Sequence, residues 1–127
     1  MKVLLKKLEL NREDYYQVHL SLINCILPRK MTPTEIKVLS SHMSIEGTLQ
    51  DYPFSPTANK NVMETLGLSS GGHSNYMKSL IKKGFIVVDK KKKKSIIDIL
   101  KPEFPLQEYK FRIVNIVKDD SDSRKPS

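Results

Sequence analysis

Two helical patterns in residues 63–100 are separated by only a tight turn, and two runs rich in β-branched residues follow them. Gly67 stops the first pattern, and the letters LSS after it start the second. The second pattern predicts a helix over residues 70–83 that ends before Gly84, a helix-terminating glycine. The order helix, turn, helix and hairpin restricts the fold more than any other part of the chain.

The hairpin is predicted from residues 85–88 and 95–100, whose β-branched residues favour strands on either side of an Asp-Lys turn. In the preceding helix, Met77, Leu80 and Ile81 form an apolar stripe that faces the core. The opposite face of this helix is polar. The segment therefore has a buried side and an exposed side.

Two further helices begin with a cap followed by proline. Thr32 precedes Pro33, and Glu35 completes a capping box three residues after Thr32. Ser55 and Pro56 repeat the signal before the third helix. Between these helices, residues 48–55 read as a loop.

A first helix is predicted over residues 11–27, with Asn11 as its N-cap and apolar residues at helical spacing. The only cysteine, Cys25, lies in an apolar run, so we expect it to be buried rather than catalytic. One cysteine allows no internal disulfide, which favours a reducing compartment such as the cytoplasm.

The chain of 127 residues fits one domain. Residues 1–117 are predicted to form it, with an edge strand or extended arm over residues 1–10 and a last strand over residues 108–117. Residues 118–127 are polar and predict a disordered tail. No apolar run approaches the roughly 20 residues that span a bilayer, so no membrane association is expected.

The positive charge is concentrated in the same segment as the helix and hairpin. Residues 70–94 hold eight Lys and one Asp, a net charge of +7 in a chain whose total is +8. Five of these lysines, at residues 90–94, form the hairpin tip. A lysine run can simply keep a hairpin soluble, but beside a helix with a polar face it favours a polyanionic partner.

The stretch LGLSSGGHSNYMKSLIKKGFI resembles the turn, recognition helix and first wing strand of a winged helix-turn-helix domain. The run TPTEIKVL from Thr32 resembles the first-helix opening of MarR-like members. The resemblance covers residues 31–100 and implies an α+β, mainly α fold with an extra N-terminal helix and terminal strands. The chain departs from the family pattern at two places. The position of His73 is usually apolar in the family, and a histidine there is more often a packing residue than a ligand. The two residues before it, Gly71 and Gly72, replace better helix formers.

The resemblance implies sequence-specific binding of double-stranded DNA, as a small transcriptional regulator or a replication-associated factor. The recognition helix would lie in the major groove, where Asn75 could pair with adenine, and the lysine-rich wing would lie on the backbone. The two glycines would let backbone N–H groups approach a phosphate. The predicted DNA-binding residues are Ser70, Gly71, Gly72, Ser74, Asn75, Lys78, Lys82, Lys90, Lys91, Lys92, Lys93 and Lys94.

Other functions stay open at this point. The domain could be a protein-protein adaptor, or a structural or virion-associated component, because a fold does not fix a function. RNA binding is a weaker alternative, since no aromatic stacking motif is present. A homodimer through the helix over residues 11–27 is plausible, because paired half-sites add affinity.

No catalytic, cofactor or metal site is expected. The chain has no phosphate-binding glycine loop, no Cys or His cluster and no nucleophile motif. The abundance of Lys, Ile and Asn suggests an AT-rich phage or bacterial genome.

Overall fold

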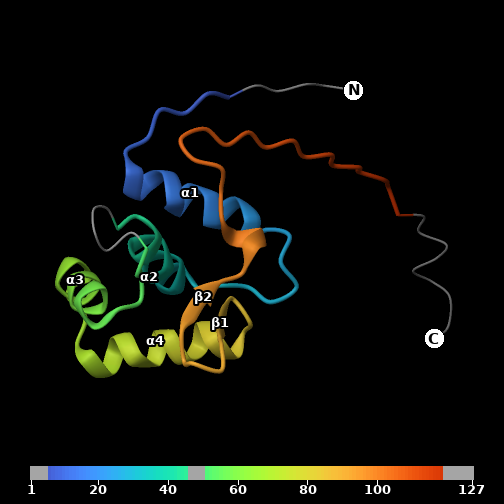
Figure 1. Cartoon of the computed structure of the whole chain (residues 1–127). Coiled ribbons are helices and arrows are strands. Elements are labelled where there is room, and N and C mark those ends of the chain that lie inside the picture. The colour runs from blue at the N-terminus through green and yellow to red at the C-terminus, as the bar shows by residue number, and fades with distance from the viewer. Residues whose placement is uncertain (1–5, 46–50, 119–127) are drawn as a thin grey trace, which may run out of the picture.

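The computed structural model describes residues 6–45 and 51–118. This part of the chain is mainly helical and ends in a small antiparallel sheet (Figure 1). The helices are α1 (Arg12–Asn24), α2 (Pro33–Met43), α3 (Pro56–Leu66) and α4 (Ser70–Lys82). The strands β1 (Ile86–Val88) and β2 (Lys94–Ile96) follow, and then the short 3-10 helix η2 (Asp98–Leu100).

Each helix begins at the cap that its sequence indicates. Asn11 accepts the Asp14 N–H at 2.8 Å, and Thr32 forms the complete capping box with Glu35. Ser55 and Ser69 cap α3 and α4 in the same way, each through its hydroxyl oxygen. These contacts satisfy N–H groups that have no partner inside the helix, so the positions of the helix starts follow directly from local sequence.

The turn between α3 and α4 is short because Gly67 ends α3 in a left-handed conformation, with φ of 65°. A residue with a side chain is strained at this angle, so glycine suits the position. The Leu68 N–H then donates to the Met63 carbonyl at 2.9 Å, which closes the end of α3. Ser69 starts α4 immediately afterwards.

The main core lies between α1, α2, α4 and the hairpin. Leu20, Leu39 and Leu80 come from the three helices and are fully buried. Ile86 and Ile96 come from the two strands, lie opposite each other in the sheet and pack against the same cluster. The hairpin is therefore fixed to the body on one side while its other side is exposed.

A smaller cluster holds α3. Ala58 and Val62 are fully buried and pack with Ile45, which follows α2. Leu66 is partly buried and contacts both clusters. It therefore connects α3 to the main core just before the turn into α4.

The predicted strand over residues 108–117 is wrong within this chain. The segment is extended, but no other strand pairs with it among the residues that the structure describes, because the sheet there consists of β1 and β2 alone. Residues 6–10 form no strand either, and residues 1–5 lie outside the described part. The C-terminal segment passes α1 and then runs away from the body (Figure 1).

The predicted burial of Cys25 is also wrong, because α1 ends at Asn24, earlier than the predicted residue 27. Cys25 is the C-cap residue and is exposed, and its thiol donates to the Ser21 carbonyl at 3.6 Å. At the hairpin, β2 ends at Ile96 and a 3-10 turn replaces the rest of the predicted strand. The predicted tail from residue 118 lies outside the described residues except for Lys118, which is exposed.

A buried carboxylate joins the start of α2 to the end of α4. Glu35 is 2% exposed and accepts hydrogen bonds from the Ser79 hydroxyl and the Lys83 ammonium, each at 2.6 Å. It also accepts the Thr32 N–H of its own capping box at 2.8 Å. Burial raises the pKa of Glu35, but these donors outweigh it, and the net pKa lies below the ordinary value.

We expect Glu35→Gln to lower the free energy of unfolding by about 1 to 3 kcal/mol, because the amide loses the ion pair and turns an N–H₂ toward a donor. Urea unfolding at pH 7 measures the change. Glu64→Gln is the control, since Glu64 is exposed on α3, and its effect should stay within about 0.5 kcal/mol. Equal stabilities of the two variants would show that the Glu35 contacts contribute little.

Candidate nucleic-acid interface

The predicted DNA-contacting residues of α4 lie on its exposed side. Ser70, Ser74, Asn75, Lys78 and Lys82 are all exposed. The opposite side of α4 carries buried Met77 and Leu80, with Ile81 partly buried beside them. We call these five exposed residues the polar face of α4. Their spacing follows from the helical repeat, since residues three or four apart share a side.

The two glycines at the start of α4 differ in their surroundings. The Gly72 N–H donates to the Ser69 hydroxyl oxygen at 3.0 Å, and a Cβ at this position would lie 3.1 Å from that oxygen. Gly72 is therefore explained by the cap of α4. Gly71 is exposed and has no atom within 4 Å of the place where a Cβ would sit. Only Gly71 leaves open space for the close approach predicted from sequence.

The lysine-rich hairpin tip has a defined backbone. The Asp89 carboxylate accepts the N–H groups of Lys91 and Lys93, each at 2.8 Å, and the Asp89 N–H donates to the Lys93 carbonyl at 3.0 Å. Lys92 adopts a left-handed conformation with φ of 62° between them. The one acid of the basic segment therefore shapes the turn that presents the lysines. An Asp that precedes a turn commonly accepts such N–H groups, so this role was recognisable in the sequence.

The tip lysines point into solvent except for the last. Lys90, Lys91, Lys92 and Lys93 are exposed. Lys94 belongs to β2 and is partly buried. Burial lowers the pKa values of His42 and His73, and the positive charge of Lys94 lowers them further.

Arg29, which is not among the predicted DNA-binding residues, lies beside the end of α4. Arg29, in the connection between α1 and α2, is exposed and donates to the Lys82 carbonyl at the end of α4 at 3.1 Å. A guanidinium at a helix C-terminus is favoured by the helix dipole. The contact joins residues 53 positions apart, so no local pattern could have indicated it.

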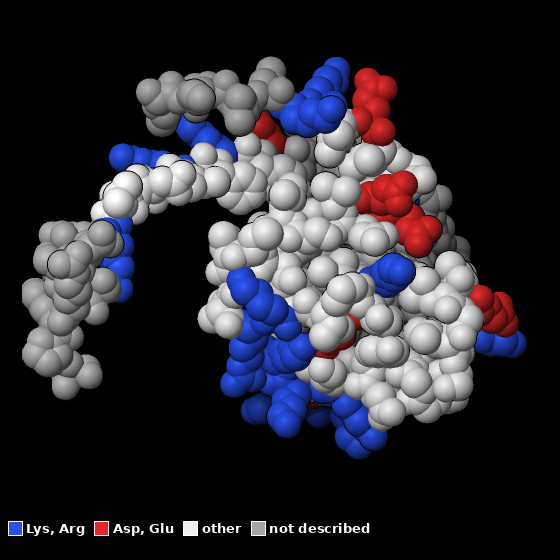
Figure 2. Space-filling model, turned by 180° about the vertical axis from the view of Figure 1, so that it is seen from behind, with Lys and Arg blue, Asp and Glu red and all other residues white. Residues whose placement is uncertain are grey.

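The basic side chains gather at one end of the molecule. Figure 2 shows Lys and Arg side chains concentrated at the lower end of the view, the end where α4 and the hairpin lie in Figure 1. Acidic side chains gather higher on the same face (Figure 2). We call the set Arg29, Lys78, Lys82 and residues 90–94 the basic surface. Other Lys and Arg side chains lie near the upper end and on the extended segment, but the densest group is at the lower end (Figure 2), which favours one orientation toward a polyanion.

His73 is not part of the polar face. It is 5% exposed, and its Nε2 lies 2.9 Å from Nε2 of His42 on α2. Nδ1 of His42 lies 2.6 Å from the Pro53 carbonyl. A carbonyl can only accept, so His42 donates through Nδ1 and accepts through Nε2 from the His73 N–H. The pair holds α2, α4 and the segment before α3 together, as expected of a packing histidine, and its pairing with His42 was not predicted.

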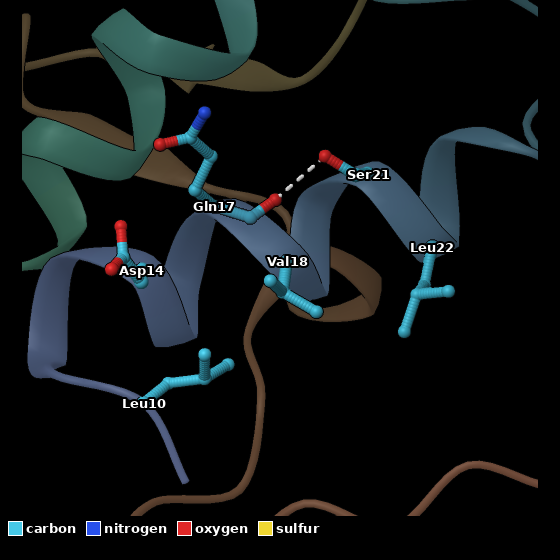
Figure 3. A pocket seen from close by; sticks show the side chains of 6 residues that line it. All are labelled: Leu10, Asp14, Gln17, Val18, Ser21 and Leu22. Carbon is cyan, nitrogen blue, oxygen red and sulfur yellow. Dashed lines mark hydrogen bonds between the residues drawn. The ribbon is translucent and has the colours of Figure 1, made fainter. Parts of the chain in front are cut away.

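Apolar residues of α1, the helix predicted to mediate a dimer, pack into the protein's own core. Leu20 is fully buried, and Ile23 packs against the core cluster. A different side of α1 has an open depression, and Leu10, Asp14, Val18 and Leu22 line it (Figure 3). Gln17 and Ser21 complete its lining. None of the predicted DNA-binding residues borders it.

Two further features concern the described residues, 6–45 and 51–118. No helix there is long and apolar enough to cross a membrane. No group of three or more His, Cys, Asp or Glu side chains in residues 6–45 and 51–118 is placed to hold a metal ion. Comparisons with models of protein families, with curated proteins and with solved structures find no match to this chain.

Acid should destabilise the protein through the histidine pair. Burial lowers the pKa of His42 from 6.5 to about 4, so the unfolded chain binds the proton first and stability falls as pH drops from about 6.5 to about 4. We expect the free energy of unfolding to be about 2 kcal/mol lower at pH 5 than at pH 7. Urea unfolding at both pH values measures this difference. His42→Gln should remove most of it, and an unchanged pH dependence in that variant would contradict the assignment.

Proposed function

We propose that the chain binds double-stranded DNA as a winged helix-turn-helix domain. In this proposal α3 and α4 form the helix-turn-helix, and β1 and β2 form the wing. The observation that carries the proposal is the position of the polar face of α4 next to an ordered hairpin tip with four exposed lysines. These features belong to one basic end of the molecule.

The dimensions of α4 suit the major groove. Its 13 residues make a helix about 20 Å long at 1.5 Å per residue, and the groove of B-DNA admits a helix. Ser74, Asn75 and Lys78 lie in the middle of the polar face, where base edges would come closest. Asn75 offers the amide that pairs with both the N6 and N7 atoms of adenine.

The hairpin supports affinity rather than sequence choice. Its exposed lysines can approach phosphates, and such contacts act through charge and carry no base information. Arg29 adds a further charge at the end of α4. In this proposal Ser74, Asn75 and Lys78 choose the site, while Arg29 and the exposed hairpin lysines hold the phosphate backbone.

A protein that reads bases with one helix and holds the phosphate backbone with its hairpin would act as a small transcriptional regulator or a replication-associated factor. We place it in the cytoplasm of a bacterium or of a phage-infected cell, in line with the composition of the chain. Adaptor function is the competing outcome. Co-purification with a stoichiometric partner that survives nuclease treatment, without salt-dependent DNA binding, would favour it.

Replacing Lys90, Lys91, Lys92, Lys93 and Lys94 with Ser should weaken binding to all duplex sequences alike. The turn should persist, because Asp89 bonds to backbone N–H groups and not to the lysine side chains. Because Lys94 is partly buried, four exposed lysines contribute, and the slope of log affinity against log salt should become about 3 to 4 units less negative, from roughly 0.9 per phosphate contact. Fluorescence anisotropy across a salt series measures it.

Lys37→Ser is the matched control, because Lys37 is exposed on α2 and lies outside the basic surface. Its salt slope should equal that of the parent protein. DNA affinity of the parent weaker than millimolar at low salt would reject DNA binding itself.

Asn75→Ala should relax base preference at particular positions without changing the salt slope. The loss of a bidentate contact corresponds to about 1 to 3 kcal/mol of discrimination. Selection from a random duplex library, followed by sequencing, compares the variant with the parent. Asn61→Ala serves as control, since Asn61 is exposed on α3 rather than α4. An unchanged site preference in Asn75→Ala would remove Asn75 from the reading residues.

A further inference from the structure

The segment after η2 is attached to α1 and then leaves the body with its apolar side chains exposed. Phe104 lies against Tyr16 with stacked rings, and Tyr109 Oη lies 2.5 Å from His19 Nδ1. Beyond Tyr109 the chain runs outward from the body (Figure 1). Residues 110–117, which we call the arm, are all exposed.

The arm is unusually apolar for a solvated segment. Ile113, Val114, Ile116 and Val117 are 68% to 97% exposed. β-branched side chains of this kind favour an extended strand, and an exposed run of them marks an interaction surface. The only charged residues of the arm, Lys110 and Arg112, are basic.

The depression on α1 has the complementary chemistry. Val18 and Leu22 supply an apolar floor one helical turn apart, and Asp14 precedes them by another turn (Figure 3). Glu13 is exposed next to Asp14, so the start of α1 is acidic. The Arg12 guanidinium lies over the Phe104 ring, 4.6 Å from the ring centroid.

The spacings of the two elements agree. Asp14, Val18 and Leu22 rise about 6 Å per step along α1. Arg112, Val114 and Ile116 share one side of an extended strand and advance about 6.6 Å per step. A strand parallel to α1 would therefore place Arg112 near Asp14, Val114 near Val18 and Ile116 near Leu22. Both charge and apolar contact fit in this single register.

The protein's own arm does not suit this position. Tyr109 is held at His19, whereas Asp14 lies five residues earlier and about 140° around the helix. The chain would have to cross α1 toward its N-terminus within three residues and then reverse direction. The residues from Lys110 to Arg112 include no Gly or Pro to favour such a reversal. A second copy of the chain has no such constraint.

We propose that the arm of one chain docks on the α1 depression of a second copy, and that the exchange is reciprocal in a two-fold dimer. Each protomer then supplies one arm and one depression, as an isologous interface requires. In Figure 1, α1 and α4 lie at opposite sides of the body. The interface therefore leaves the polar face and the basic surface free, and it does not depend on DNA binding.

Cross-linking tests the register directly. In a Cys25→Ser background, Val18→Cys and Val114→Cys are prepared as separate proteins, mixed, and oxidised with glutathione disulfide. The mixture should form a covalent dimer that contains both variants, and neither variant alone should do so. A homodimer of Val114→Cys alone would mean that arms pair with arms, and absence of any cross-link would remove the proposed contact; either result overturns the proposal.

A chain that carries both cysteines distinguishes an arm that docks on a second copy from an arm that folds back onto its own α1. Val18→Cys/Val114→Cys in the same background should give disulfide-linked dimers on non-reducing gels. A disulfide within one monomer would show that the arm covers its own α1 and would overturn the proposal.

Sedimentation equilibrium without DNA measures the strength of association. Val114→Asp should raise the dimer dissociation constant about tenfold or more, because a buried apolar anchor is lost. Ile99→Asp is the control, since Ile99 is an exposed apolar residue outside the arm and the depression, and it should leave the constant unchanged. Both positions are exposed, so neither variant should unfold the body.

A charge exchange provides the final check. Asp14→Arg and Arg112→Asp should each weaken the dimer, and the double variant should recover most of the loss. A monomeric parent protein at high micromolar concentration would overturn the proposal whatever the variants show. Loss of the dimer with intact DNA binding, or the reverse, distinguishes this interface from the proposed DNA function.

Discussion

The buried Glu35 carboxylate is the interaction on which the orientation of α4 depends. It accepts from its own capping box and from Ser79 and Lys83 at the other end of the core. A carboxylate at 2% exposure is tolerated only because these donors replace water. Since two of them belong to the end of α4, the same contact that satisfies the charge also positions the helix. Lys83 therefore does not belong to the basic surface, which consists of Arg29, Lys78, Lys82 and the hairpin lysines.

The histidine pair restrains α4 near its other end. His73 lies in the first half of the helix and bonds to His42 of α2, while Glu35 holds the last turn. Between them Met77 and Leu80 pack into the core. The polar face is therefore presented by a helix that is restrained along its whole length, which reduces the ordering cost of binding a rigid partner. The hairpin tip follows the same principle, because Asp89 shapes its backbone before any partner binds.

Local features were predicted well, and features that depend on distant partners were not. The caps at Thr32 and Ser55 depend on hydrogen bonds spanning three residues, so the sequence displays both partners together. Cys25 was misplaced because Pro28 indicated a helix end near residue 27, whereas α1 ends at Asn24 and leaves Cys25 as its exposed C-cap. The strand predicted over residues 108–117 has the right composition but no partner strand in the described part of the chain. Composition indicates an extended segment and says nothing about what pairs with it.

The sequence by itself determined the order of the elements, the starts of the helices, the side of α4 that carries Ser74 and Asn75, and the concentration of lysines after it. These properties arise from helical periodicity and from contacts within a few residues. Only the tertiary structure decided that Arg29 joins the basic surface, that His73 pairs with His42, and that Glu35 connects two helices. Their partners are 31 to 53 positions away along the chain, and separations of that size are brought together by packing alone.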